Sequence, residues 1–184
     1  MKNTSNNGMM PQCTITRKRI TSGDKILFEA SDGIDFFQSA YDALTINYPR
    51  YFKVDHLSKL ALLASAVIFP ERIIEEHAYS TGLVLSTHHG SLDTDMRFWE
   101  STKQVASPSL FVYTLANVMA GELCIRYGIK GENYCFATIG FQPQWHAEQS
   151  KLLRHHANLK QVLHGYANYI NGYYEANFWL ESFS

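Results

Sequence analysis

The sequence has little cysteine and no excess of charge of either sign. Its three cysteines, Cys13, Cys124 and Cys135, are far apart and form no Cys-x-x-Cys pair. This spacing excludes a disulfide framework and a cysteine-based zinc site, and it favours a reducing, cytoplasmic setting. Sixteen basic and seventeen acidic residues give a formal charge of -1. We therefore expect no nucleic acid partner, because nothing would attract a phosphate backbone.

The sequence also lacks a long hydrophobic run and a domain linker. The longest apolar run, residues 60–69, is too short to cross a bilayer, so no membrane span is expected. Residues 1–12 are polar and Asn-rich and lack the charged and apolar regions of a secretory signal, so we expect a flexible tail there. No shift of composition divides the remainder, and residues 13–184 are predicted to form one domain.

What is present is an alternation of strand-like and helix-like segments. Alternating or continuous apolar residues predict strands at 13–21, 25–30, 82–87, 133–139, 161–170 and 177–183. Apolar residues at helical spacing predict helices over 35–48, 56–69, 111–126 and 144–158. Asp55 is a good N-cap for the second helix, which is apolar almost all round and therefore buried. The alternation predicts a layered α/β domain whose central strands include those at 82–87, 133–139 and 161–170.

The segment "SPSLFVYTLANVMAGELCIRYGIKGE", residues 107–132, has an unusual arrangement. Pro108 fits the first position of a helix, where its missing N–H has no cost. Gly128 and Gly131 are predicted to supply positive φ angles that end the helix. An apolar stripe is formed by Val112, Leu115, Met119 and Leu123. On this pattern alone the segment is a buried connecting helix.

The same segment resembles the one that precedes the nucleophile in β-ketoacyl-acyl-carrier-protein synthases. Family members typically read Pro-x-x-Phe, Thr-x-Pro-Asn, Gly and Gly-x-x-Gly-Pro there. The matching residues here are Ser107, Pro108, Phe111, Thr114, Leu115, Asn117, Gly121, Ile125, Gly128, Lys130, Gly131 and Glu132. Upstream, residues 48–68 resemble the Lys-Met-Asp segment and first long core helix of the family, and residues 82–100 resemble the strand and loop that follow. The sequence also resembles the short ketosynthase-like proteins of aryl-polyene and flexirubin type pathways. These resemblances cover roughly residues 48–181 and imply the N-terminal half of a thiolase-like fold.

The family's chemistry needs a thiolate to take the acyl chain and two further polar groups, usually histidines, which belong to the C-terminal half of the family fold. We expect the chain to end before that half. Where families read something like Thr-Ala-Cys-Ser-Ser, this sequence reads "CFATIGFQPQW", so Phe141 or Gln142 occupies the nucleophile position. Chain-length factors, the inactive partners in two-subunit ketosynthases, often have glutamine there.

Cys135 lies some six residues too early to be the nucleophile, and like Cys124 it is expected to be a buried core residue. No catalytic residue and no cofactor is therefore expected.

Two other groups of residues bear on function, one of histidines and aspartates and one of aromatic residues. His88, His89, Asp93 and Asp95 carry groups that bind metals, but adjacent histidines point apart on an extended backbone and no distant ligand has a recognisable spacing, so no metal site is expected. The end of the chain is rich in aromatic residues, which either line an acyl pocket or cover a dimer interface. We favour the interface for this group, which comprises Tyr166, Tyr169, Tyr173, Tyr174, Phe178 and Trp179.

The resemblance implies a non-catalytic partner of a complete 3-oxoacyl-acyl-carrier-protein synthase, or of a second copy of this chain, in fatty acid or polyene biosynthesis. Two alternatives stay open: a module that binds an acyl chain or an acyl carrier protein, and an acyltransferase with an unrecognised nucleophile. Ketosynthase dimers pair the strand that precedes the nucleophile, here residues 133–139, across a two-fold axis. Candidates for the interface or acyl pocket are Phe111, Thr114, Asn117, Met119 and Ala137.

Overall fold

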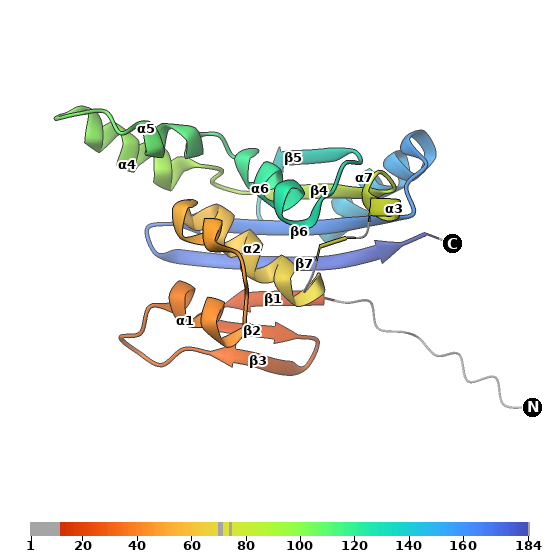
Figure 1. The fold of residues 1–184 in the computed structure, drawn as a ribbon, viewed down its shortest axis with the longest axis horizontal. Coiled ribbons are helices and arrows are strands. Elements are labelled where there is room, and N and C mark those ends of the chain that lie inside the picture. The colour runs from red at the N-terminus through yellow and green to blue at the C-terminus, as the bar shows by residue number, and fades with distance from the viewer. Residues whose placement is uncertain (1–11, 70–71, 74, 184) are drawn as a thin grey trace, which may run out of the picture.

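The structure is a computed structural model that describes residues 12–69, 72–73 and 75–183, with only the backbone described at 155–157. In these residues one mixed seven-stranded sheet has the order β3-β2-β1-β7-β6-β4-β5 (Figure 1). Its strands are β1 (Gln12–Thr16), β2 (Arg19–Ser22), β3 (Lys25–Glu29), β4 (Thr81–Thr87), β5 (Asn133–Ala137), β6 (Gln161–Ile170) and β7 (Tyr173–Ser182). The expected tail lies outside the described residues except for Gln12, which begins β1.

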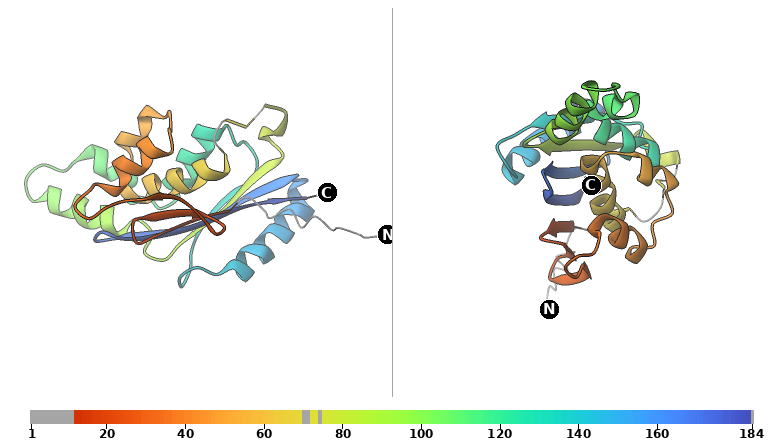
Figure 2. Two further views of the ribbon diagram at one scale, coloured as in Figure 1. Left: turned by 90° about the horizontal axis from the view of Figure 1, so that it is seen from below. Right: turned by 90° about the vertical axis from the view of Figure 1, so that its left-hand side faces the viewer.

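Helices lie on both faces of the sheet. They are α1 (Phe36–Ala43), α2 (His56–Ile68), α3 (Glu75–Ala78), α4 (Leu92–Thr102), α5 (Pro108–Phe111), α6 (Val118–Tyr127) and α7 (Pro143–Ala157), with two 3-10 turns, η1 (Pro49–Lys53) and η2 (Val112–Thr114). Figure 2 shows α1, α2 and α6 on one face and α7 on the other. Strand β4 runs parallel to both β5 and β6 and is buried at every position. The predicted layered α/β architecture is confirmed.

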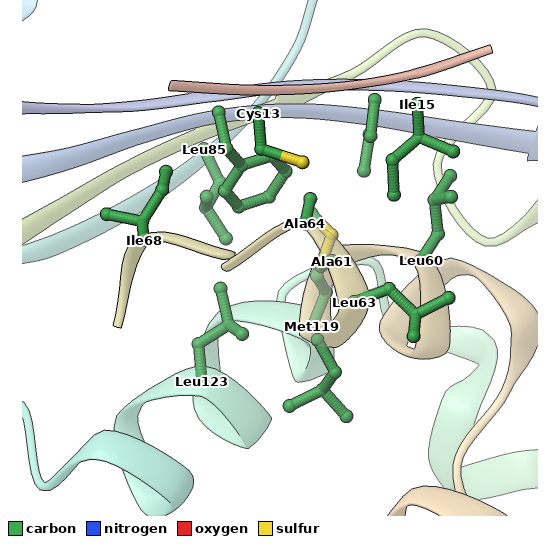
Figure 3. Close-up of a cluster of buried hydrophobic side chains, with 14 of the residues drawn as sticks. Cys13, Ile15, Leu60, Ala61, Leu63, Ala64, Ile68, Leu85, Met119 and Leu123 are labelled. Atoms are coloured by element: carbon green, nitrogen blue, oxygen red, sulfur yellow. The ribbon is translucent and has the colours of Figure 1, made fainter. Parts of the chain in front are cut away.

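The core lies between the sheet, α2 and α6, as the apolar character of α2 predicts. Ala61 and Ala64 lie in the middle of this packing, and Leu63, Met119 and Leu123 lie around them on the α6 side (Figure 3). The helix begins as expected, because Asp55 Oδ1 accepts the Ser58 N–H at 3.1 Å. Burying these side chains supplies the main stabilisation of the fold.

Two local predictions near the N-terminus were wrong. Residues 13–21 form a hairpin of β1 and β2 and not a single strand, because Arg17 and Lys18 turn the chain with φ of 46° and 64°. A two-residue turn of this kind normally carries Asn or Gly, and neither is present here, so the turn was not predicted. The helix predicted over 35–48 ends at Ala43, since Thr45 has a φ of 50°.

The helix predicted over 111–126 is broken. Pro108 does begin a helical turn, but the chain is extended at Leu115, and α6 begins only at Val118. Ser91 Oγ donates to the Thr114 carbonyl at 2.6 Å, which holds the break in place. Of the four stripe residues, Val112 and Leu115 are exposed and only Met119 and Leu123 are buried. In the described part of the chain no single helix is long and apolar enough to cross a bilayer, and the pair 108–114 and 118–127 is bent by 95°.

The two glycines at the end of that segment act differently from each other. Gly128 has the predicted positive φ, 73°, at the end of α6. Gly131 does not have a positive φ, but a Cβ at this position would overlap the Thr81 carbonyl oxygen, so the residue is needed for close approach of two backbones. The strand that follows, β5, ends at Ala137 and lies at the edge of the sheet, whereas a central position was predicted.

Candidate functional site

The turn between β5 and α7 is the position at which the resemblance places a nucleophile. Gly140, with a φ of 69°, turns the chain, Gln142 is the N-cap residue, and Pro143 is the first residue of α7. Both Phe141 and Gln142 therefore stand at a strand-to-helix elbow, where helix N–H groups would stabilise an anion. Gln142 Nε2 instead donates to the Ile139 carbonyl at 3.1 Å, so its side chain folds back over the turn.

The ring of Phe141 lies against the sheet. Its centroid is 5.8 Å from the rings of both Tyr166 and Trp179 and 6.5 Å from His146. The side chain is 39% exposed, so these contacts cover only part of the ring. An aromatic ring cannot form a thioester or an ester, and it occupies the space beside the elbow.

A buried polar network lies beneath this ring. Ser86 Oγ and His146 Nε2 are hydrogen-bonded at 2.8 Å, which ties the first turn of α7 to β4. His164 Nε2 donates to Glu181 Oε2 at 3.0 Å. Ser150 Oγ donates to the same carboxylate oxygen at 2.6 Å. None of these residues was predicted from the sequence, although a histidine inside the apolar run of β6 indicates a buried polar contact.

Both histidines of this network are neutral at pH 7. Burial, together with a smaller contribution from the neighbouring His164, lowers the pKa of His146 to about 4. Burial also lowers the pKa of His164, although the hydrogen bond and negative charge of Glu181 oppose this. Neither imidazole carries a charge that could support an anionic reaction intermediate.

The Ser86–His146 pair has the composition of a nucleophile and base, but its surroundings do not suit catalysis. Both side chains are fully buried, and His146 Nδ1 has no hydrogen-bond partner in the described residues. A catalytic histidine needs a group that orients it and a nucleophile that a substrate reaches. The pair fixes α7 on the sheet.

The cysteines lie away from the elbow. Cys135 is on β5, and its thiol points to the Ala116 carbonyl at 3.7 Å. It is partly exposed, and not fully buried as predicted, but burial still raises its pKa to about 11. Burial also raises the pKa of Cys124, which is partly exposed too. Both thiols are therefore protonated at neutral pH, which is unfavourable for a nucleophile.

The five residues considered for an interface or acyl pocket are not brought together. Phe111 is 61% exposed, and Thr114 Oγ1 donates to the Phe111 carbonyl at 2.8 Å. Asn117 is exposed at the start of α6, and Ala137 is exposed at the end of β5. Met119 is different, because it lies in the core with 1% exposure. Its substitution would disturb folding and not an interface alone.

The C-terminal aromatic residues mostly pack inside the molecule. Tyr166 and Phe178 are 1% exposed. Tyr174 packs on the rings of Phe36 and Phe37, and Trp179 stacks on His164 at 4.7 Å. Tyr173, at 59% exposure, is the large exposed ring of the group. The interface suggested for this group is therefore wrong for its buried members, because they fill the spaces on the two faces of β6 and β7.

The two adjacent histidines after β4 do not point apart as predicted. Their rings meet edge to face, with centroids 4.4 Å apart. His88 Nδ1 is 3.0 Å from the Thr138 carbonyl oxygen, and His89 Nδ1 is 3.0 Å from Asn168 Oδ1. These bonds join the loop after β4 to the loop after β5 and to strand β6. Within the described ranges, no group of three or more His, Cys, Asp or Glu side chains is placed to hold a metal ion.

A second candidate site is a cationic pocket of about 210 Å³ where α2, α4 and α5 meet. Lys53, Lys59 and Arg97 line it from three different elements. It also contains Asp55, but both carboxylate oxygens of this residue are hydrogen-bonded within the fold, to the Ser58 N–H and the Thr94 hydroxyl. In the described part of the chain none of the three cations forms an ion pair with a carboxylate. The pocket therefore presents net positive charge to solvent.

No protein-family model and no curated protein sequence matches this chain. Among solved structures, the ishigamide ketosynthase/chain length factor matches 96% of this chain and 62% of its own, with a TM-score of 0.70 and 18% identity. The ketosynthase ApeO in complex with its chain length factor ApeC from Xenorhabdus doucetiae matches 85% of this chain and 65% of its own (TM-score 0.55, 14% identity). A β-ketoacyl synthase from Burkholderia phymatum STM815 matches 74% and 44% (TM-score 0.57, 10% identity).

This chain spans less than two thirds of the length of each of these structures. At such low identity the likeness establishes the fold. The thiolase-like fold expected from the sequence is thereby confirmed.

Proposed function

Because the chain has the fold of the ketosynthases, we propose that it is a chain-length-factor-like, non-catalytic partner of a complete 3-oxoacyl-acyl-carrier-protein synthase. The observation that carries this proposal is Phe141. Its ring stands at the elbow where the family resemblance expects a thiolate, and it packs on Tyr166 and Trp179. A phenyl ring at this place cannot be acylated, which favours support of an active subunit over catalysis at the elbow.

The surface that suits such a partner is the edge of the sheet. Strand β5 pairs with β4 on one side only. Exposed apolar side chains accompany it, with Tyr134 at 40%, Ile139 at 84% and, on the neighbouring α7, Leu152 at 56% exposure. A free strand edge with apolar neighbours invites pairing with another chain. The partner is a complete ketosynthase or a second copy of this chain, and the stable interface would bury on the order of 1,000 Å² or more.

This proposal is tested by co-expression with a full-length ketosynthase from the source organism, using a tag on the ketosynthase alone. We expect the chain to co-purify. Ala137→Glu places a charge on the exposed end of β5 and is expected to abolish co-purification, because an unpaired charge at an interface is costly. Ala43→Glu, on the exposed end of α1, is the matched control and should co-purify normally. Equal recovery of both variants would show that β5 is not part of the interface.

The cationic pocket favours a second role, the docking of an acyl carrier protein as an acidic partner. Lys53 also lines a neighbouring pocket with Arg50, but Arg50 is paired with the Glu122 carboxylate, so the unpaired positive charge is that of Lys53, Lys59 and Arg97. Opposite charges speed and orient the encounter of two proteins. The Lys53→Glu/Arg97→Glu double variant should weaken binding of a holo carrier protein, and binding to the wild type should fall with salt. Lys25→Glu, on β3, is the control that should bind normally.

A further inference from the structure

A small aromatic pocket opens on the sheet face that carries α7. It has a volume of about 220 Å³ and lies between β1, β7 and the start of α7. Side chains along a strand alternate between faces. The residues of β1 and β7 that share this face away from the pocket, Thr16 and Glu175, are polar. Such a face is normally solvated. The apolar walls provided by Phe141, Pro143 and Trp179 therefore stand out from their surroundings.

The two rings of the pocket are held in position by the fold. Trp179 stacks on His164 with an angle of 10° between the ring planes, and His164 is itself fixed by Glu181. Phe141 meets Trp179 at 71°. Fixed aromatic walls reduce the entropy that a ligand must overcome on binding, and they favour a flat, apolar ligand group.

One polar side chain sets the chemistry of the ligand. Asn177 Oδ1 accepts the Thr14 hydroxyl at 3.2 Å, which leaves the amide NH₂ of Asn177 as a donor at the pocket. No charged side chain lines the pocket in the part of the chain that the structure describes. A neutral oxygen acceptor therefore fits better than a carboxylate. An apolar cavity of about 150 Å³ is enough for benzene, so this volume suits one ring with a small substituent.

We propose that this pocket binds a neutral monocyclic aromatic compound with a carbonyl oxygen. The ring lies against Phe141 and Trp179, and the carbonyl accepts a hydrogen bond from the Asn177 amide. This site shares Phe141 with the proposed function, but it lies on β1, β7 and the start of α7 and uses no residue of the β5 edge, so ligand binding can be tested without the partner.

The test uses the full chain labelled with ¹⁵N and benzamide as the probe. The indole N–H signals of the three tryptophans are assigned with Trp99→Phe and Trp145→Phe variants, so Trp179 itself need not be changed. We expect a saturable shift of the Trp179 signal at millimolar benzamide, while that of Trp99, on α4, stays in place. Cyclohexanecarboxamide, which has the same amide on a puckered ring, should bind several-fold more weakly. An unmoved Trp179 signal, or equal binding of the two amides, would overturn the proposal.

Two variants test whether Asn177 and Phe141 contribute to benzamide binding. Asn177→Asp keeps the acceptor for Thr14 but loses the donor, and should weaken benzamide binding by about tenfold. Asn47→Asp makes the same change in an exposed loop and should leave the binding constant unchanged. Phe141→Ala, at a partly exposed position, should also weaken binding by removing one wall. Wild-type affinity in both Asn177→Asp and Phe141→Ala would contradict the proposed site.

Discussion

Ser86 on β4 and His146 on α7 are hydrogen-bonded at 2.8 Å, and both side chains are fully buried. This bond, 60 residues apart in sequence, joins the helix that begins at the elbow to the central strand of the parallel part of the sheet. The position of Phe141 therefore depends on a polar contact beneath it. Burial of this imidazole favours its neutral form, because a charge there would be desolvated.

Acid should destabilise the protein through this contact. Because burial lowers the pKa of His146 in the folded state to about 4, the unfolded chain binds the extra proton first. The stabilisation is complete above pH 6.5 and is lost as the pH falls toward 4, amounting to on the order of 3 kcal/mol. Urea unfolding at several pH values measures this. His146→Gln should show a shallower pH dependence, and His77→Gln, on α3, should behave like the wild type.

A pair of glycines tests the packing of the sheet. A Cβ at Gly165, on β6, would overlap the Phe178 ring and Leu85, so Gly165→Ala should lower the free energy of unfolding by about 1–3 kcal/mol. Gly121, in α6, has no heavy atom within 4 Å of a built Cβ. Gly121→Ala should raise stability by roughly 0.5–1 kcal/mol, because alanine is the better helix former. Denaturant titration of both variants gives the comparison, and a destabilised Gly121→Ala would contradict the position of α6.

Substitution should lower the stability of the chain strongly at Met119 and hardly at all at Ala137. Met119 is buried among α2 residues, so Met119→Ala should cost about 2–5 kcal/mol of unfolding free energy. Ala137 is exposed on the edge strand, and Ala137→Glu should change the stability of the isolated chain by less than about 0.5 kcal/mol. Thermal or urea unfolding measures both effects. A large loss of stability in Ala137→Glu would show that Ala137 is buried within the isolated chain.

Incubation with an acyl-thioester or an acylated carrier protein should leave no covalent adduct. Phe141 has no nucleophilic atom, Ser86 is buried, and burial raises the pKa of Cys135 to about 11. Intact-mass analysis at pH 7 tests this directly. An acyl mass that disappears in Cys135→Ala or Ser86→Ala would favour an acyltransferase over a non-catalytic partner.

The features that follow from local sequence signals could be predicted. Asp55 caps α2, Pro108 begins α5, and the Asn171–Gly172 turn joins β6 and β7 with φ of 48° and 79°. In each case a residue with a strong conformational preference marks the position. The thiolase-like fold came from the resemblance and not from these signals.

The features set by tertiary contacts could not be predicted. The break at Leu115 depends on Ser91, whose hydroxyl reaches the Thr114 carbonyl from another helix. The Arg17–Lys18 turn contains no glycine or asparagine, the residues from which such a turn is predicted. At the site, Phe141 and Gln142 were found from the resemblance, but the His146 and His164 contacts needed the packing of α7 on the sheet.

The proposed partnership is tested most directly by light scattering on the chain co-expressed with a complete ketosynthase from the source organism. We predict a single species whose mass corresponds to one copy of each protein, at concentrations down to the low micromolar range. Two separate species, with this chain monomeric even at high micromolar concentration, would contradict the partner role.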